Sequence, residues 1–516
     1  MAWLLRCFLF KSASQKGEVS GMGKWLSAAE WIGWGALGIL LPFTSLPLLA
    51  NLRGSSMVAP PSAVALGILG LVWFIPYVLR KGNLPGQAMP LLGFFLIALL
   101  GCLFSLFLPL PAFKTITPLR NMLQAILTLV IGVSFFLLTS VWFQREKRLF
   151  FFLRIINWSG ILIILWSGVQ AWAWKQYLEY PEWMWKFQEQ ISSSYMLFFG
   201  RVTGFAYEPS WLGHQLNMLY LPFWLSASLN GFSAHRRLWK ISFENILLTG
   251  GLITLWLSIS RIGYLTFIAM AGFLFLEIYF RLVRWIRTRL FKTQTGKLFV
   301  FSASALISIF LLVVYIGLLF AAGYGLSKVD PRMATIFNFS ALKGNPLFVY
   351  ANQLVFAERL VFWEAGWGVF NDYPFLGVGL GNAGFFFPEK LNAFSWALTE
   401  ISILVFRWGS IPNIKSLWVR LLAETGLIGF STFIAWCFIM WISARYLMSG
   451  REKLLRVMGW TGCFVLSGLI VEGFNMDTFA LPYFWVSLGI VAAACQTMRR
   501  RSRMDSEQEV GSLERG

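Results

Sequence analysis

The chain is poor in charged residues and in the side chains that build metal or disulfide sites. Only 13% of its 516 residues are charged, and it contains 2 histidines and 5 cysteines. The cysteines form no C-x-x-C pair, so the sequence predicts neither a zinc site nor a disulfide framework. No small-residue cleavage site follows the short apolar run at the N-terminus, which argues against a cleaved signal peptide.

Apolar and aromatic residues dominate instead, at 57% and 17% of the chain, with a mean hydropathy of +0.66. A soluble protein could not hide so much apolar surface, and apolar stretches of about 20 residues, the length that spans a bilayer, recur throughout. The sequence therefore predicts an all-α polytopic membrane protein with about 12 transmembrane helices. We expect these helices over residues 28–50, 62–79, 88–110, 121–143, 149–173, 209–229, 242–260, 262–281, 298–323, 417–446, 454–472 and 478–497.

The formal net charge of +20 is explained by topology, because the basic residues cluster in alternate loops between apolar spans. Cytoplasmic loops are enriched in Lys and Arg, so both termini are predicted to be cytoplasmic, and no nucleic-acid partner is expected. Residues 1–27 are predicted to form a cytoplasmic arm, and 498–516, basic and then acidic, a disordered cytoplasmic tail.

Two long segments interrupt the short loops, and both fall on the predicted outer side. Residues 174–208, within the unit of helices one to nine at 28–323, are rich in Trp and Tyr and suggest an interfacial amphipathic helix. Residues 324–416 precede helices ten to twelve at 417–497. This second segment is too long for a passive connection, and such loops are usually functional.

The segment GVGLGNAG, Gly377–Gly384, contains the G-x-G-x-x-G spacing of dinucleotide-binding turns. Such a turn needs a preceding strand, a following helix and a multi-stranded sheet, and an outer loop offers none of these clearly. The sequence therefore predicts no nucleotide cofactor here. The glycines instead indicate a sharp turn or a close approach of the backbone to another group.

Charged residues near the predicted outer membrane face are the first candidates for function, because charges in lipid are costly without partners. Arg201 and Glu208 precede the sixth helix, which Pro209 should open. An interfacial salt bridge between the two is the structural alternative, and His214 is expected to pack in the bundle. Arg261 lies between two apolar segments and either snorkels to headgroups or points into a polar cavity.

Two further segments supply candidates. In the first, Glu358–Trp367 suits a short amphipathic helix that ends near Asp372–Pro374. The guanidinium of Arg359 beside the backbone N–H groups of the glycine-rich turn would suit a phosphate. The alternative is a folded loop on the membrane. The predicted binding residues of this segment are Arg359, Gly379, Gly381 and Asn382.

In the second segment, Asn413 and Lys415 lead into the tenth helix, where Arg420 and Glu424 share a face at i, i+4 and should form a structural pair. Basic positions that converge on one membrane face suggest a phosphorylated lipid ligand. Cations fixed in the protein could neutralise a diphosphate leaving group, so no metal and no cofactor are expected.

Five motifs in this order resemble the O-antigen ligase and polymerase superfamily of bacterial membrane glycosyltransferases. They are R-x-x-G-x-x-x-E-P-S at Arg201–Ser210, S-x-S-R at Ser258–Arg261, R-x-x-x-W with P-x-x-G-V-G-x-G-N at Arg359–Asn382, L-L-A-E-x-G-L-I-G at Leu421–Gly429, and L-P-Y-F-W at Leu481–Trp485.

This resemblance implies a GT-C-like fold that transfers glycan from an undecaprenyl diphosphate carrier to an acceptor hydroxyl, outside the cytoplasmic membrane. The implied partners are the lipid-linked glycan donor, a glycan acceptor and the bilayer, together with a flippase and a chain-length regulator. Arg261, Arg359 and Lys415 would bind the diphosphate with help from Arg201, and Glu208 would orient or deprotonate the acceptor.

One position departs from the family pattern. Ligases of the family carry a His-Asn or His-Ser dyad where this chain has Lys415 and Ser416. A protonated lysine is no general base, so the resemblance favours a polymerase of O-antigen, exopolysaccharide or capsule over a ligase. The alternatives are ligase-type transfer to a lipid or protein acceptor, and a transporter or lipid flippase, with an assembly scaffold as a third class.

Overall fold

The computed structural model is helical throughout the part of the chain that it describes. It describes residues 21–53, 58–177, 179–235, 241–290, 297–329, 356–407, 409 and 411–513. The fold is 76% helical and contains no strand within these ranges, where an isolated bridge joins Ser45 and Ala59. The predicted all-α class is confirmed. Most of the predicted arm, residues 330–355 of the predicted large loop and the last three residues lie outside the described ranges.

The described helices fall into two halves of the chain. Those of the first half are α2 (Gly21–Leu40), α3 (Pro47–Arg53), α4 (Pro61–Leu69), α5 (Ile75–Leu79), α6 (Ala88–Ser105), α7 (Pro118–Trp142), α8 (Glu146–Tyr177), α9 (Glu182–Ile191), α10 (Pro209–Gln215), α11 (Leu221–Leu229) and α12 (Phe243–Ser258). Those of the second half are α13 (Arg261–Leu290), α14 (Lys297–Val329), α17 (Ala357–Asp372), α18 (Phe387–Lys390), α19 (Thr399–Ser402), α20 (Leu417–Met448), α21 (Lys453–Glu472) and α22 (Tyr483–Leu513).

Seven helical segments in the described chain are long and apolar enough to cross a membrane. They are Pro61–Leu79, Ala88–Ser105, Pro118–Trp142, Glu146–Tyr177, Arg261–Trp285, Leu417–Met448 and Lys453–Glu472. The chain is therefore a polytopic membrane protein by the length and composition of its helices. The count of twelve stays a prediction: α12, with 16 residues, is short, and the predicted span 209–229 is divided by a π-helical turn at Leu216–Tyr220.

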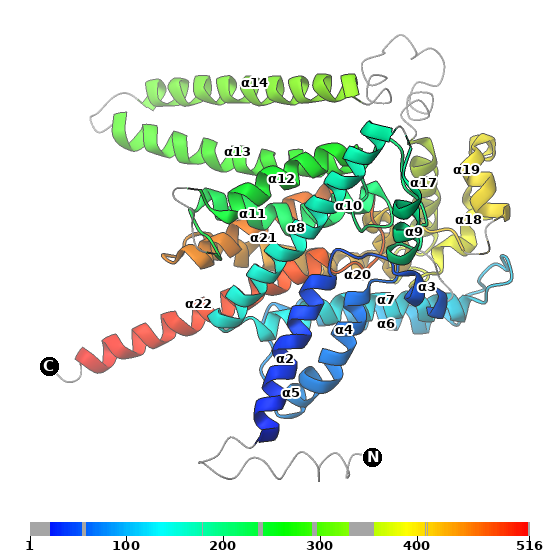
Figure 1. Ribbon diagram of the computed structural model, residues 1–516, viewed down its shortest axis with the longest axis horizontal. Coiled ribbons are helices and arrows are strands. Elements are labelled where there is room, and N and C mark those ends of the chain that lie inside the picture. The colour runs from blue at the N-terminus through cyan, green and yellow to red at the C-terminus, as the bar shows by residue number, and fades with distance from the viewer. Residues whose placement is uncertain are drawn as a thin grey trace.

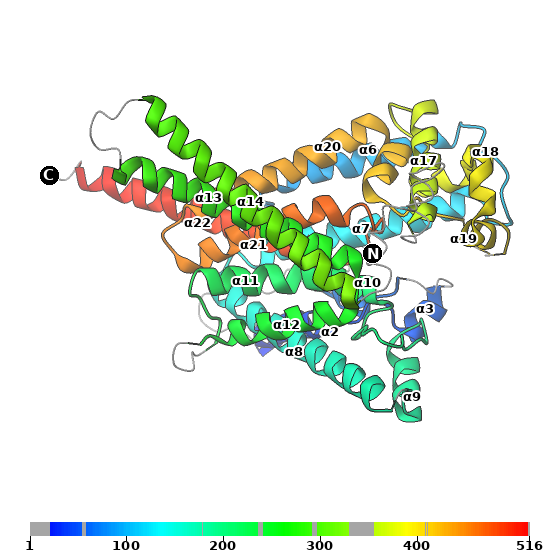
Figure 2. The same cartoon turned by 90° about the horizontal axis from the view of Figure 1, so that it is seen from above.

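Several helices that are not candidate membrane spans gather at one end of the helix bundle (Figure 1). Helices α17, α18 and α19 gather there together with α3 and α9, while α22 ends at the opposite side of the molecule in both views (Figures 1 and 2). The two long segments predicted on one side of the membrane, 174–208 and 324–416, thus have their described short helices at the same end of the bundle.

The described part of the large loop has an apolar cluster of its own. Buried Val361, Phe362 and Val369 of α17 pack in one cluster with Phe387 and Ile414, separately from the main core of the helix bundle. Helix α17 packs against α20. The expected helix ending near Asp372 is confirmed, and the apolar face of α17 holds the loop on the bundle.

The predicted disorder of the tail is wrong for the described residues, since α22 continues as a helix to Leu513. The Arg501 guanidinium forms ion pairs with the carboxylates of Glu146, at 2.8 Å, and Glu452. These residues open α8 and precede α21, so the basic start of the tail is held by acidic groups of neighbouring helices. These partners are distant in the sequence, so the composition of the tail alone does not indicate them.

Candidate functional site

A cavity of about 910 Å³ lies between α7, α10, α17 and the segments that precede α20 and follow α21. Seven of the eleven predicted site residues line it, and they come from parts of the chain more than two hundred residues apart. They are Glu208, Arg359, Gly381, Asn413, Lys415, Arg420 and Glu424. The structure therefore brings three of the four predicted charged segments to one place.

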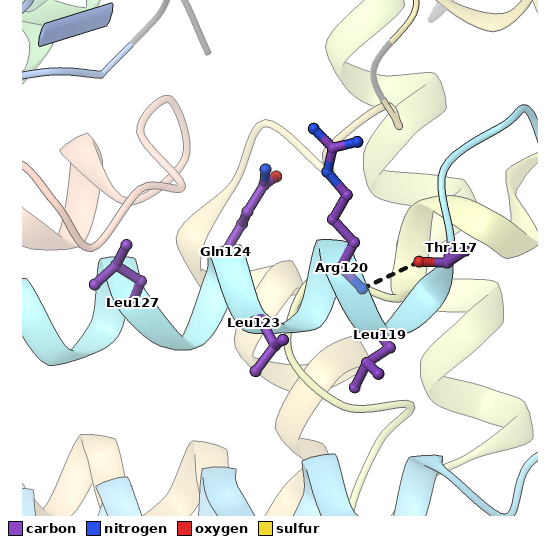
Figure 3. A pocket seen from close by; sticks show the side chains of 6 residues that line it. All are labelled: Thr117, Leu119, Arg120, Leu123, Gln124 and Leu127. Atoms are coloured by element: carbon purple, nitrogen blue, oxygen red, sulfur yellow. Dashed lines mark hydrogen bonds between the residues drawn. The ribbon is translucent and has the colours of Figure 1, made fainter. Parts of the chain in front are cut away.

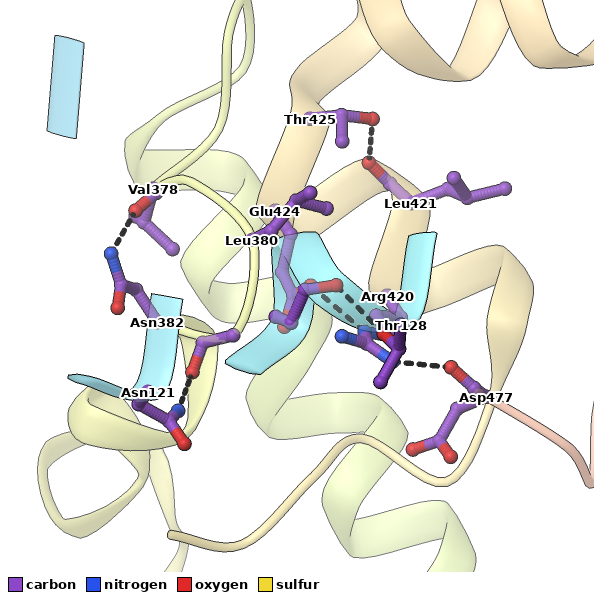
Figure 4. Close-up of polar contacts among 12 residues, drawn as sticks. Asn121, Thr128, Val378, Leu380, Asn382, Arg420, Leu421, Glu424, Thr425 and Asp477 are labelled. Atoms are coloured by element: carbon purple, nitrogen blue, oxygen red, sulfur yellow. Dashed lines mark hydrogen bonds and ion pairs between the residues drawn. The ribbon is translucent and has the colours of Figure 1, made fainter. Parts of the chain in front are cut away.

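The predicted pair of Arg420 and Glu424 is confirmed. Both side chains are buried, and the Arg420 Nε donates to the Glu424 carboxylate over 2.8 Å (Figure 4). The Arg420 guanidinium also donates to the main-chain carbonyl of Asp477 and lies 5.2 Å from the ring centre of Phe479. Removing one partner of such a buried pair costs about 3–5 kcal/mol, because the remaining charge is left uncompensated.

Lys415 lies in a tight turn immediately before α20. Its backbone has a left-handed φ of 56°, and its N–H donates to the Asp477 carboxylate over 3.0 Å. The next residue, Ser416, caps α20 by accepting the N–H of Val419. The Lys415 ammonium lies 5.0 Å from the ring centre of Phe362. This turn fixes the lysine at the wall of the cavity.

Arg359 approaches the same wall from α17. It is half-buried, and its Nη1 lies 3.4 Å from the main-chain carbonyl of Asn475, to which it donates. The segment 473–478 after α21 thus contacts Arg359, Lys415 and Arg420 through its own backbone and carboxylate groups. This segment was not among the predicted site residues; its signal in the sequence is the run N-M-D-T, which places Asn475, Asp477 and Thr478 between two apolar spans.

The other wall of the cavity is acidic and aromatic. Glu208 occupies the N-cap position of α10, which begins at the expected Pro209, and the Ser210 hydroxyl hydrogen-bonds to its carboxylate. The rings of Tyr207 and Trp211 lie 5.3 Å apart beside it. Burial, and next the negative charge of Glu208, raise the pKa of Tyr207. The Tyr207 phenol therefore stays protonated near neutral pH and can donate a hydrogen bond.

A polar face of α7 completes the lining. Asn121, Gln124 and Thr128 all border the cavity, at the spacing that places residues on one side of a helix. Sequence reasoning missed them because α7 is otherwise an apolar span. Gln124 and Leu127 also border a second, adjoining cavity of about 380 Å³. Arg120, Gln124, Leu119 and Leu123 all line this second cavity. The side chains of Arg120 and Gln124 point to one side of α7, and those of Leu119 and Leu123 point to the other (Figure 3).

The glycine-rich turn at Gly377–Gly384 follows α17 rather than a strand, and it packs on a break in α20. Gly377, Gly379 and Gly381 have φ of 65°, 81° and 80°. The N–H of Val378 donates to the Ala423 carbonyl and that of Gly379 to the Glu424 carbonyl, each over 3.0 Å.

Further N–H groups of this turn also have partners within the chain. The Gly381 N–H donates to the Glu424 carboxylate, and the Asn382 amide donates to the Val378 carbonyl over 3.1 Å (Figure 4). Gly381 borders the cavity, whereas Gly379 and Asn382 do not. Because these N–H groups already have acceptors, the cations of the cavity offer the better site for an anion.

Arg201 and Arg261 lie outside the lining of this cavity. The Arg201 guanidinium donates to the carbonyls of Ser258 and Ile259, at 3.4 Å each. These carbonyls end α12, where a cation is favourable because of the helix dipole. Arg261 begins α13 and is half-buried. The diphosphate contacts expected for these two arginines stay predictions.

No group of three or more His, Cys, Asp and Glu residues in the described ranges is arranged to hold a metal ion. Fold, helix composition and cavity define the class of the protein: an all-α, multi-pass membrane protein with a polar cavity at one end of its bundle. A scan against protein-family models gives no match to the chain, and a search of the curated proteins gives none either.

Proposed function

We propose that this chain is a membrane glycosyltransferase that polymerises or transfers undecaprenyl-diphosphate-linked oligosaccharide on the outer side of the cytoplasmic membrane. The observation that carries the proposal is the single cavity in which Arg359 and Lys415 share the lining with Glu208. Glu208 and Arg359 come from two of the segments on which the resemblance rests, Lys415 precedes a third, and the chain separates the three residues widely.

The side of the cavity that Arg359 and Lys415 line, which we call the cationic wall, suits a diphosphate. An arginine binds phosphate oxygens in a bidentate fork and a lysine adds a point charge. Arg420 is buried and forms an ion pair with Glu424. Arg359 and Lys415 are half-buried at the wall of the cavity and are therefore the candidates for direct contact. Fixed cations in a site shielded from water stabilise the charge that develops on a leaving group.

The acidic wall suits the acceptor. The acceptor hydroxyl attacks the anomeric carbon of the donor sugar, the bond from that carbon to the diphosphate oxygen breaks, and the hydroxyl proton passes to Glu208. The products are the new glycosidic bond and undecaprenyl diphosphate. The Ser210 hydroxyl orients the Glu208 carboxylate, and the protonated Tyr207 phenol is placed to donate to a sugar oxygen.

The proposed topology has both termini in the cytoplasm, about twelve transmembrane helices and a GT-C-like arrangement. Its support is the alternation of basic loops along the sequence and the common location of α9 and α17–α19 at the cavity end (Figure 1). With this orientation the cavity would open away from the cytoplasm, on the side where lipid-linked glycans are assembled into polymers.

The turn before α20 favours polymerase over ligase chemistry. Family ligases carry a histidine at the position of Lys415, and the lysine here is poorly suited to proton abstraction. Its ammonium, 5.0 Å from the centre of the Phe362 ring, is better suited to diphosphate binding. In this proposal Glu208 acts as the base, and a glycan is the acceptor.

Turnover by the purified protein separates the candidate functions. We expect the protein in nanodiscs with a lipid-linked oligosaccharide to release undecaprenyl diphosphate and to form longer glycans. Arg359→Ala should reduce this release strongly, whereas Arg80→Ala, at an exposed arginine outside the cavity lining, should not. A lipid flippase would move the donor between leaflets without consuming it, and a scaffold would do neither. Either result would overturn the proposal.

A further inference from the structure

The carboxylate of Glu472 lies in the interior of the bundle with both oxygens engaged. It is the last residue of α21 and is fully buried. One oxygen lies 3.1 Å from Nδ1 of His214, and the other accepts the Thr266 hydroxyl over 2.7 Å. Burying a carboxylate costs free energy of folding unless its hydrogen-bond partners are well placed. The partners here come from two other helices, α10 and α13.

Each of these three helices has a predicted or observed site residue at its nearby end or in the adjoining segment. His214 follows Glu208 by six residues in α10, and Thr266 follows Arg261 by five residues in α13. Glu472 precedes Asp477 by five residues. The Glu472 carboxylate therefore joins the helix of the acidic wall to the helix that leads into the cationic wall, a short distance along the chain from each.

The main chain of Glu472 extends the same link into the cavity. Its carbonyl accepts the N–H groups of Asn475 over 2.9 Å and of Met476 over 3.0 Å, so the segment 473–478 winds directly onto this residue. That segment in turn holds Arg359 through the Asn475 carbonyl and Lys415 through the Asp477 carboxylate. A shift of Glu472 would move the cations with it.

We propose that Glu472, bound by His214 and Thr266, is a positioning residue that sets the distance between the Glu208 wall and the cationic wall. Glu472 is not itself a lining residue of the cavity, and it contacts the lining through its carbonyl, which accepts the N–H groups of Asn475 and Met476. Its structural role stands on the hydrogen bonds above, while its effect on turnover rests on the proposed function. Displacements of about 1 Å in reacting groups can change rates by about 100-fold.

The Thr266 hydroxyl offers the mildest way to loosen the link. The Thr266→Val substitution keeps the volume of the side chain and removes the hydroxyl. The Thr266→Ser substitution keeps the hydroxyl and removes the methyl group. Thr461→Val is the matched control, because Thr461 is a buried threonine of α21 whose hydroxyl bonds to its own helix, at the Val457 carbonyl. Glu472→Gln, which keeps the shape and removes the charge, serves if Thr266→Val does not accumulate in the membrane.

The first measurement is hydrogen exchange of the full-length protein in nanodiscs, followed on peptides that cover 411–417 and 473–478. We expect Thr266→Val to speed exchange in both segments roughly tenfold, as the loss of one hydrogen bond to a charged group allows. Thr266→Ser and Thr461→Val should exchange as the wild type does. Wild-type exchange in Thr266→Val and Glu472→Gln would overturn the inference.

The second measurement is turnover of the lipid-linked donor. We expect Thr266→Val to lower kcat by about 10- to 100-fold with little change in KM, because misplaced reacting groups slow the chemical step, and Thr266→Ser to restore it. A uniform loss of folded protein would instead lower the active fraction in Thr461→Val as well. Absence of turnover in the wild type would refute the proposed function, while the exchange measurement would still decide the positioning role.

Discussion

Gly426 is the residue at which α20 breaks, and its substitution tests how the glycine-rich turn and the buried ion pair depend on each other. Its backbone has a φ of 63° and a ψ of −171° inside an otherwise helical element. A Cβ added here would lie 2.1 Å from the Phe375 carbonyl oxygen. Only glycine adopts this conformation readily, and only glycine leaves room for the approaching chain.

The cost of Gly426→Ala has two parts. The backbone conformation alone costs a side-chain-bearing residue about 1–3 kcal/mol. The clash then pushes away the segment that contains Pro374 and Phe375, whose carbonyls accept the N–H groups of Leu427 over 2.7 Å and Ile428 over 3.3 Å. Each lost bond is worth about 1 kcal/mol net. Together these effects predict a destabilisation of about 3–5 kcal/mol.

The assay is unfolding of the purified protein by SDS, followed by tryptophan fluorescence. Gly93→Ala is the matched control, because an added Cβ at this glycine of α6 meets nothing within 4 Å. That change should be neutral or stabilise by up to about 1 kcal/mol. If Gly426→Ala unfolds at the same SDS concentration as Gly93→Ala, the docking of the turn into the helix break does not carry the stability we assign to it.

Three further predictions concern the cavity walls. Asp477→Asn should lower stability towards SDS by about 1.5–3 kcal/mol, because the Lys415 N–H loses its charged acceptor; an unchanged midpoint would contradict this contact. Glu208→Gln should lower kcat for donor turnover by about 100- to 10,000-fold, the range for a lost general base, and wild-type kcat would remove Glu208 from that role. Because the folded pKa of Tyr207 is raised, its contribution to stability is present below the unfolded pKa of about 10 and is lost as pH rises towards the folded pKa. As the pH rises above about 10, thermal midpoints of the Tyr207→Phe variant should therefore fall less than those of the wild type, and parallel curves would refute this.

The features that could be predicted from the sequence are those governed by local rules. Pro209 begins α10 and α17 ends at Asp372, as proline geometry and helix termination suggest. Arg420 and Glu424 pair because their i, i+4 spacing brings them together in any helix. The recurrent apolar runs indicated a polytopic membrane protein because membrane-spanning length is itself a local property.

The features that could not be predicted from the sequence depend on which distant segments come into contact. The role of the segment 473–478 follows from its contacts with Arg359, Lys415 and Arg420, and none of these is near it in the chain. The glycine-rich turn donates hydrogen bonds to carbonyls of α20 next to the helix break at Gly426, which lies more than forty residues away in the chain. A pattern of glycines records a tight approach but not the identity of the group approached.

The central claim is that Arg359 and Lys415 hold the diphosphate of a lipid carrier in the cavity. It is tested most directly by binding of undecaprenyl diphosphate to the purified wild type, to the Arg359→Ala/Lys415→Ala double variant and to Arg80→Ala, measured by native mass spectrometry. We predict that the double variant binds at least about tenfold more weakly, since each lost charge-assisted contact is worth more than about 1 kcal/mol, while Arg80→Ala binds as the wild type does. Equal binding by the double variant and the wild type would contradict the claim.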